Sequence, residues 1–182
     1  MDNFRGQEVK IIGYSNGFLK LAIDDNTFGY TIPTFIPNGK QYEKILQEKL
    51  EKEISSKKGV YFLSNEVHSI NSADGVDIRI VFGYNGEKPI KYLSLKMKSY
   101  NRVGDQVSDK ISGDKIFTID LTGPINKFNH RAFTHDAFFY NSTAVCMELI
   151  NVSLEFMDGT KKNYSTDMSE IFVSSMVNDC GY

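Results

Sequence analysis

Residues 89–105 read PIKYLSLKMKSYNRVGD, and this stretch decides the fold that we expect for the chain. From Leu93 to Lys98 apolar side chains alternate with polar ones, so one face would meet a core and the other would meet water. The stretch ends in NRVGD, whose Asn, Gly and Asp favour the backbone conformations of a turn. Similar alternating runs closed by turn residues follow downstream. The sequence therefore predicts a mainly β protein.

Length and charge limit the classes of function. The chain has 182 residues, which suits one domain or one domain with a subdomain. Its formal charge of −2 leaves no basic excess for a phosphate backbone, so we expect no nucleic acid partner. The apolar runs are only a few residues long, which predicts no membrane span. The start, MDNFRGQEVK, has no signal-peptide pattern, so the protein would be cytoplasmic if Met1 is the native start.

The N-terminal part predicts a small β-meander followed by one helix. Residues 9–32 contain short β-rich runs, and Asn16-Gly17 between two of them is a strong hairpin signal because this pair accepts positive φ. Residues 38–58 carry apolar side chains at helical spacing, with Asn38 in the position of an N-cap. This predicts an amphipathic helix over 38–58.

A polar connection over residues 64–75 suggests a domain boundary. We therefore expect an N-terminal region, 1–75, and a β-sandwich with a C-terminal tail, 76–182. In the second region the runs recur at the spacing of about 8–12 residues that is typical of a sandwich of some seven strands. The runs that we assign to strands are 76–82, 90–100, 117–121, 133–140, 145–156 and 161–165.

Two features of the C-terminal part interrupt the alternation. The apolar phase slips between Leu149 and Ile150, which predicts a β-bulge or a loss of pairing there. Residues 167–177 place apolar side chains at helical spacing behind a possible Asp167 cap, which predicts a short helix. An edge strand around residues 171–173 is the alternative.

The sequence contains no assembled reaction centre, so we expect a protein that is not an enzyme, without cofactor or metal. Ser15 lies in a G-x-S-x-G match, but a nucleophile elbow needs a helix after the serine, and the residues that follow predict a returning strand. His130 and His135 are close in sequence, yet a five-residue spacing puts them on opposite faces of a strand. We interpret them, with His68, as histidines of surface loops.

Cys146 and Cys180 are the two cysteines of the chain. The favoured interpretation is two unrelated thiols, with Cys146 buried in a strand as a small apolar side chain. The alternative is a disulfide that ties the tail to the sheet and implies an oxidising compartment.

Several short segments, in their order along the chain, resemble a bacterial immunoglobulin-like β-sandwich domain of unknown function. The resemblance covers residues 76–164 only, and the chain departs from the family at Ala137-Phe138-Phe139, where members commonly have a Trp-rich strand. The matching segments are I-K-Y (90–92), Y-N-R-V-G-D (100–105), T-G-P (122–124), Y-N-S-T (140–143), Cys146 and D-G-T (158–160).

This resemblance implies an immunoglobulin-like sandwich with an accessory or adhesive role in the cell envelope or outside the cell, and no catalysis. If the two turns near Tyr100 and Tyr140 share one end of the sandwich, they form our candidate surface for binding a protein or a cell-surface polymer. The candidate binding residues are Tyr100, Asn101, Asp105, Tyr140 and Asn141. Each also has a structural interpretation, because Asn and Asp form turns and sandwich tyrosines often bond to loop backbone.

Two other functions fit the sequence less well. One is an intracellular partner-binding protein of the inhibitor or immunity type, which would use the helix 38–58 or the tail as its interface. The other is a serine hydrolase that uses Ser15 as its nucleophile.

Overall fold

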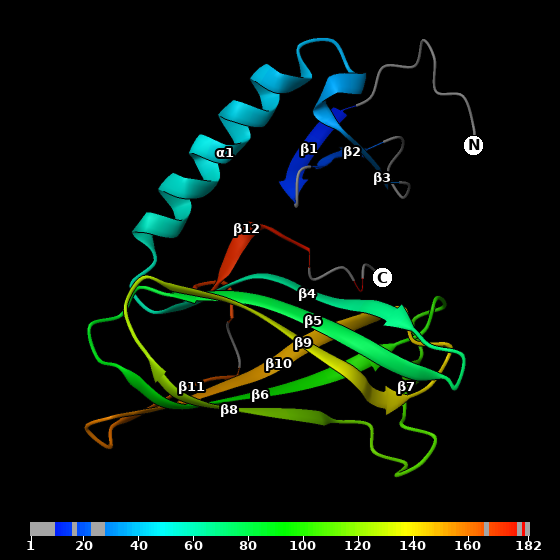
Figure 1. The fold of residues 1–182 in the computed structure, drawn as a ribbon, viewed down its shortest axis with the longest axis vertical. Helices are drawn as coiled ribbons and strands as arrows, with labels where there is room; N and C mark the ends of the chain where they lie inside the picture. Colours follow the sequence, from blue (N-terminus) through cyan, green and yellow to red (C-terminus); the bar gives the residue numbers. More distant parts are fainter. Residues whose placement is uncertain (1–9, 16–17, 23–27, 166–167, 178–179, 181–182) are drawn as a thin grey trace. The chain divides into compact units, whose positions relative to one another are not determined.

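A computed structural model describes the chain except for residues 1–9, 16–17, 23–27, 166–167, 178–179 and 181–182 (Figure 1). The protein is mainly β, as expected, and it divides into two compact units, Met1–Ile54 and Ser55–Tyr182. None of the helices in these described residues is long and apolar enough to cross a membrane.

The first unit contains the predicted meander and most of the predicted helix. Strands β1 (Lys10–Ser15), β2 (Phe18–Ala22) and β3 (Phe28–Thr31) form an antiparallel sheet in that order. The Asn16-Gly17 pair lies outside the described residues. A 3-10 turn, η1 (Pro33–Phe35), precedes helix α1 (Gly39–Ser56), where the Asn38 carbonyl accepts the first helical hydrogen bonds. The meander and the helix are thus confirmed.

The second unit is a two-layer β structure (Figure 1). One sheet has the strand order β12-β4-β5-β9, and the other has the order β11-β10-β6-β7, with β8 also paired to β6. The strands are β4 (Val60–Ile70), β5 (Gly75–Tyr84), β6 (Ile90–Tyr100), β7 (Gln106–Val107), β8 (Phe117–Ile125), β9 (Asn129–Tyr140), β10 (Cys146–Phe156), β11 (Lys161–Tyr164) and β12 (Phe172–Val177).

The core lies between these two sheets, and the stretch that begins at Leu93 supplies its centre. Leu93, Leu95 and Met97 on β6 are fully buried, whereas Lys96 between them is exposed. They belong to one apolar cluster with residues of β5 in the opposite sheet. Burying each large apolar side chain contributes about 1.5–3 kcal/mol to folding. The predicted alternation of this strand is therefore confirmed.

The boundary between the units differs from the predicted one because β4 belongs to the second unit. We expected a polar connection over 64–75, but β4 continues to Ile70 and pairs with β5 along its length. Ser64 and Asn65 are buried in this strand although they are polar. The Asn65 amide donates a hydrogen bond to the carbonyl oxygen of Met147 at 3.0 Å, which offsets part of the cost of its burial, while Asn65 Oδ1 and Ser64 Oγ have no hydrogen-bond partner among the described residues.

Of the two predictions for irregular features of the C-terminal part, one is confirmed and one is wrong. The bulge is confirmed, because the register of β10 against β6 shifts between Leu149 and Asn151. The tail helix is wrong, since the structure has the alternative, an edge strand β12 that runs parallel to β4. Val173 in β12 and Ile171 directly before the strand are both buried, which suits β-branched side chains. Asp167 lies outside the described residues.

The cysteines form a disulfide, so the interpretation as unrelated thiols is wrong. The Cα atoms of Cys146 and Cys180 lie 5.4 Å apart, within the usual range for a disulfide. Cys146 begins β10, and Cys180 follows β12, so the bond ties the tail to a central strand of the five-stranded sheet. Their separation of 34 residues gave no indication of this proximity.

The T-G-P segment lies inside β8 and does not end it. The strand continues to Ile125 across a cis peptide bond between Gly123 and Pro124. A side chain at position 123 would place its Cβ atom 2.2 Å from the backbone oxygen of Ile90, so only glycine fits there.

Candidate functional site

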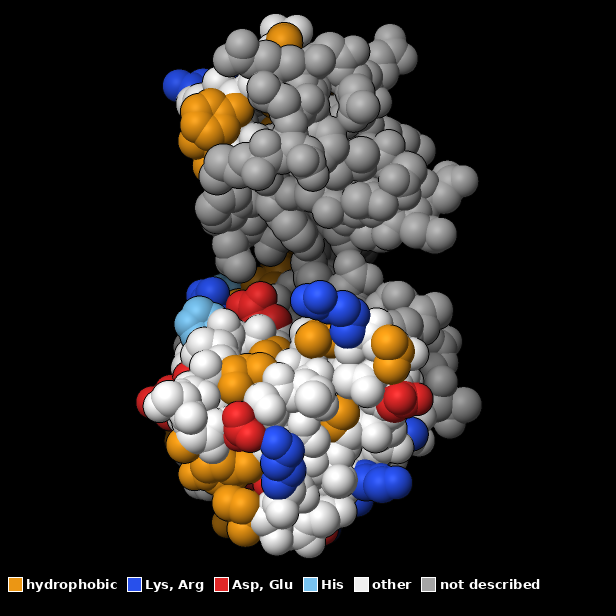
Figure 2. All heavy atoms as spheres, turned by 90° about the vertical axis from the view of Figure 1, so that its right-hand side faces the viewer, with side chains coloured by type: hydrophobic (Ala, Val, Ile, Leu, Met, Phe, Trp, Pro, Cys, Tyr) orange, Lys and Arg blue, Asp and Glu red, His pale blue; other side chains and the backbone are white. Residues whose placement is uncertain are grey.

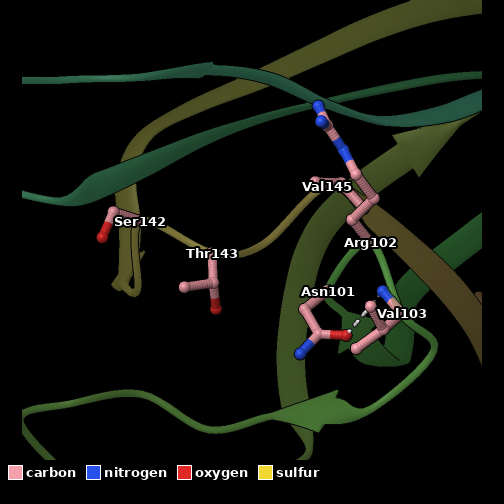
Figure 3. Close-up of a pocket in the computed structure, with 6 residues that line it drawn as sticks. All are labelled: Asn101, Arg102, Val103, Ser142, Thr143 and Val145. Carbon is pink, nitrogen blue, oxygen red and sulfur yellow. Dashed lines mark hydrogen bonds between the residues drawn. The ribbon is translucent and has the colours of Figure 1, made fainter.

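Two loops meet at one end of the sandwich. The loop 101–105 joins β6 to β7, and the loop 141–145 joins β9 to β10. The Val145 amide donates to the Tyr100 carbonyl oxygen at 2.9 Å, which holds the loops together. They line a shallow pocket of about 350 Å³ that is open to solvent, shown in Figure 3. Its lining residues are Asn101, Arg102, Val103, Ser142, Thr143 and Val145.

Asn101 and Asp105 build the first loop. The Asn101 side-chain oxygen accepts the amides of Val103 at 3.0 Å and of Asp105 at 2.9 Å. The Asn101 amide in turn donates to the Asp105 carbonyl oxygen at 3.0 Å. These bonds form an Asx-type turn that closes on itself. Both residues shape the loop, and Asn101 also lines the pocket.

Tyr140 and Asn141 hold the second loop to the segment that follows β7. The Tyr140 amide donates to the Asp109 carboxylate at 2.9 Å, and the Asn141 side-chain amide donates to the Ser108 carbonyl oxygen at 2.8 Å. The Asn141 side-chain oxygen also accepts both the amide and the hydroxyl of Thr143, at 3.0 and 2.7 Å. The candidate binding residues Tyr140 and Asn141 therefore fix the conformation of the loop, and they do not line the pocket.

Tyr100 is fixed by a carboxylate. Its hydroxyl donates to Glu148 Oε2 on β10 at 2.7 Å. This hydrogen bond, with burial and the negative charge of Glu148, raises the pKa of Tyr100 to about 12. The expectation that Tyr100 bonds to loop backbone as a corner tyrosine is not met, because the acceptor is a side chain of the neighbouring strand.

The side chains left for a ligand are ones that the sequence analysis did not select. Val103 is 77% exposed and Val145 is 45% exposed, although both are apolar. Arg102 is exposed as well, and within the described part of the chain it has no ion-pair partner. Figure 3 shows its guanidinium extending past Val145 at the rim of the pocket. The sequence signal was an apolar side chain inside a turn, Arg102-Val103-Gly104, where a polar residue is usual.

The lining of the pocket combines apolar, hydroxyl and charged groups. The pocket offers two apolar side chains, hydroxyls and one cation, which together fit a ligand with an aliphatic part and an anionic group. Figure 2 looks onto this side of the molecule and shows hydrophobic side chains in separate patches between basic and acidic ones. Among the described residues no group of three or more His, Cys, Asp or Glu side chains could hold a metal ion.

The other candidate positions do not assemble a reaction centre. β1 ends at Ser15, and the next element is strand β2, so the strand–turn–helix of a nucleophile elbow is not formed. The His130 ring lies 3.1 Å from the Tyr61 hydroxyl, while His135 Nδ1 lies 3.0 Å from the Asp136 carbonyl oxygen. The two imidazoles thus have separate partners. Both histidines lie in β9, and His68 lies in β4, so their interpretation as loop residues is wrong.

Comparison of the chain with family models, with curated proteins and with solved structures gives no match.

Proposed function

We propose that residues 76–164 belong to an immunoglobulin-like sandwich that acts as a non-catalytic binding module of a cell-envelope or secreted protein. The strand order supports this assignment. Neighbours β4-β5-β9 in one sheet and β11-β10-β6-β8 in the other correspond to the A-B-E and G-F-C-C′ orders of immunoglobulin-like domains. The disulfide differs, since such domains usually join strands B and F and this one joins β10 to the tail.

The disulfide supports a place in an oxidising compartment. Disulfides persist in secreted and envelope proteins and are rare in the cytosol, where thiols are kept reduced. An intracellular inhibitor or immunity-type protein, the second function that fits the sequence, was favoured by the expectation of free thiols. The bond between Cys146 and Cys180 removes that support.

The pocket between the loops 101–105 and 141–145 is the single observation that carries the binding function. Hydrogen bonds within and between the loops hold them in place, so binding would require little ordering. Three side chains on these rigid loops remain exposed to solvent, namely Arg102, Val103 and Val145. Two exposed apolar side chains beside a cation that has no ion-pair partner among the described residues contribute little to folding. They fit a protein or cell-surface polymer with an anionic group next to an aliphatic one.

The test compares two variants at the same end of the sandwich. Val103→Asp places a negative charge in the pocket, whereas Ile111→Asp changes a side chain of similar exposure, 74%, that does not line it. The immobilised full chain is incubated with solubilised envelope from the source cell, and the bound material is quantified. We expect Val103→Asp to abolish specific retention and Ile111→Asp to preserve it. Equal retention by both variants would contradict the proposal.

A further inference from the structure

Strand β9 forms one edge of the four-stranded sheet (Figure 1). It pairs with β5 along its length, and among the described residues no second strand pairs with it. A strand at the edge of a sheet presents a row of backbone N–H and C=O groups that have no partner within the sheet. These groups can pair with a strand of another chain, so the free edge of β9 is a candidate contact.

The C-terminal half of this edge is already closed. The Lys110 amide donates to the Tyr140 carbonyl oxygen at 2.8 Å, and the Tyr140 amide donates to the Asp109 carboxylate at 2.9 Å. Just before this point the register against β5 shifts, so that residues 136–138 lie opposite a single residue of β5. A bulge of this kind disrupts regular pairing. The regular open edge of β9 is therefore limited to residues 130–135.

Residues 130–135 lack the features that usually protect a sheet edge from pairing. They include no Pro, Lys, Asp or Glu, and all their side chains except that of the half-buried Phe133 are exposed. The other edge strands of the described second unit carry charges or proline, are very short, or have a backbone oxygen engaged. Specifically, β11 has Lys161 and Lys162, β8 has Asp120 and Pro124, β7 has two residues, and Lys57 Nζ donates to the Phe172 carbonyl oxygen of β12 at 2.6 Å.

The open edge is complementary to a second copy of itself. Two such strands can pair antiparallel about a two-fold axis at Ala132, where the smallest side chain of the edge meets its own copy. His130 then lies opposite Thr134 of the second copy. Arg131 lies opposite Phe133 of the second copy, so the positive charge faces an aromatic ring and no like charges are opposed. An identical strand therefore fits this edge in length, direction and charge.

We propose that the chain forms a two-fold dimer in which residues 130–135 of two copies pair as antiparallel strands. The pairing joins the two four-stranded sheets into one continuous sheet and satisfies the open backbone groups of both strands. Because the paired segment is short, the contact is weak and depends on the protein concentration. The dimer does not use the pocket between the loops 101–105 and 141–145, so it does not depend on the binding function proposed above.

The experiment compares the full wild-type chain with two exposed edge-strand substitutions, Ala132→Lys in β9 and Thr122→Lys in β8. Ala132→Lys places two like charges face to face at the axis, whereas Thr122→Lys adds the same charge to the other sheet. Sedimentation velocity over about 5–500 µM measures the dimer dissociation constant. We expect Ala132→Lys to raise it about fivefold or more and Thr122→Lys to leave it unchanged. Amide hydrogen exchange of the wild-type chain should slow within 130–135 as the concentration rises.

Several results would overturn this inference. A wild-type chain that stays monomeric at the highest concentration would remove the dimer, and growth beyond two copies would exclude a closed two-fold pair. Equal dissociation constants for all three chains, or equal weakening by both lysines, would mean that the β9 edge is not the contact. If Ala132→Lys lowers the melting temperature, the hydrogen exchange of the wild-type chain decides alone. Concentration-dependent protection outside 130–135 and not within it would then place the contact elsewhere.

Discussion

Removing the bond between Cys146 and Cys180 should be the most destabilising change that leaves the packing of both sheets intact. The substitution Cys180→Ser breaks the bond in the tail, where Cys180 is half-buried, and it keeps the sulfur of Cys146 in its buried position. Any loss of stability then reports the cross-link and not a cavity in the core.

The separation of the two cysteines gives the magnitude. Without the bond, the unfolded chain gains the conformational entropy of an open loop of 34 residues. This lowers the free energy of unfolding by about 3.8 kcal/mol at 25 °C. A domain of this size is typically stable by only about 5–15 kcal/mol. For the 128 residues of the second unit this loss corresponds to a fall in melting temperature of about 14 °C.

Urea unfolding followed by circular dichroism measures the effect. Wild-type and Cys180→Ser chains are compared with and without a reducing agent, which also prevents pairing between free thiols. The reduced wild-type chain should match the variant, and the oxidised chain should be more stable by the stated amount. A difference below about 1 kcal/mol, or no response of the wild-type chain to reduction, would refute the argument from loop closure.

Three other predictions test the fold and its electrostatics. Gly123→Ala should cost about 2 kcal/mol or more of unfolding free energy, since its Cβ would lie 2.2 Å from the Ile90 backbone oxygen; a neutral result in urea unfolding would exclude the close approach. Leu95→Ala should cost about 2–5 kcal/mol because the side chain is fully buried, whereas its exposed neighbour Lys96→Ala should stay within about 0.5 kcal/mol; equal effects would mean that the strand faces are assigned the wrong way round. The pKa of Tyr100 is raised from 10.0 to about 12, so its contribution to stability is complete below pH 10 and is lost as the pH rises through 12. The wild-type chain should therefore lose unfolding free energy over this pH range relative to Tyr100→Phe. Parallel curves of unfolding free energy against pH for the two chains would show that the bond to Glu148 does not hold the proton.

Sequence periodicity was a reliable guide in β6 and β10, where one strand face meets the core. The alternation from Leu93 to Lys98 depends on neighbouring residues alone, because successive side chains of a strand point to opposite faces. The slip between Leu149 and Ile150 located the bulge in β10 for the same reason. Turn residues bounded most of the strands, since their allowed backbone conformations are a local property.

The candidate site was predicted only in part. The sequence located the two loops through their turn residues, and the structure brings these loops together around a pocket. Their Asn, Asp and Tyr side chains mostly fix loop geometry through hydrogen bonds. The exposed side chains, Arg102, Val103 and Val145, carry no motif, so only their exposure in the folded chain selects them.

By itself, the sequence determined the mainly β class, the meander, the helix and the bulge, because each depends on residues close together in the chain. Only the tertiary structure decided that β4 runs through buried polar residues, since the buried Asn65 amide donates its hydrogen bond to the carbonyl oxygen of Met147, 82 positions away. It also decided that the tail forms β12 and that Cys180 reaches Cys146. These features depend on contacts between residues that are far apart in the sequence, and local periodicity carries no information about such contacts.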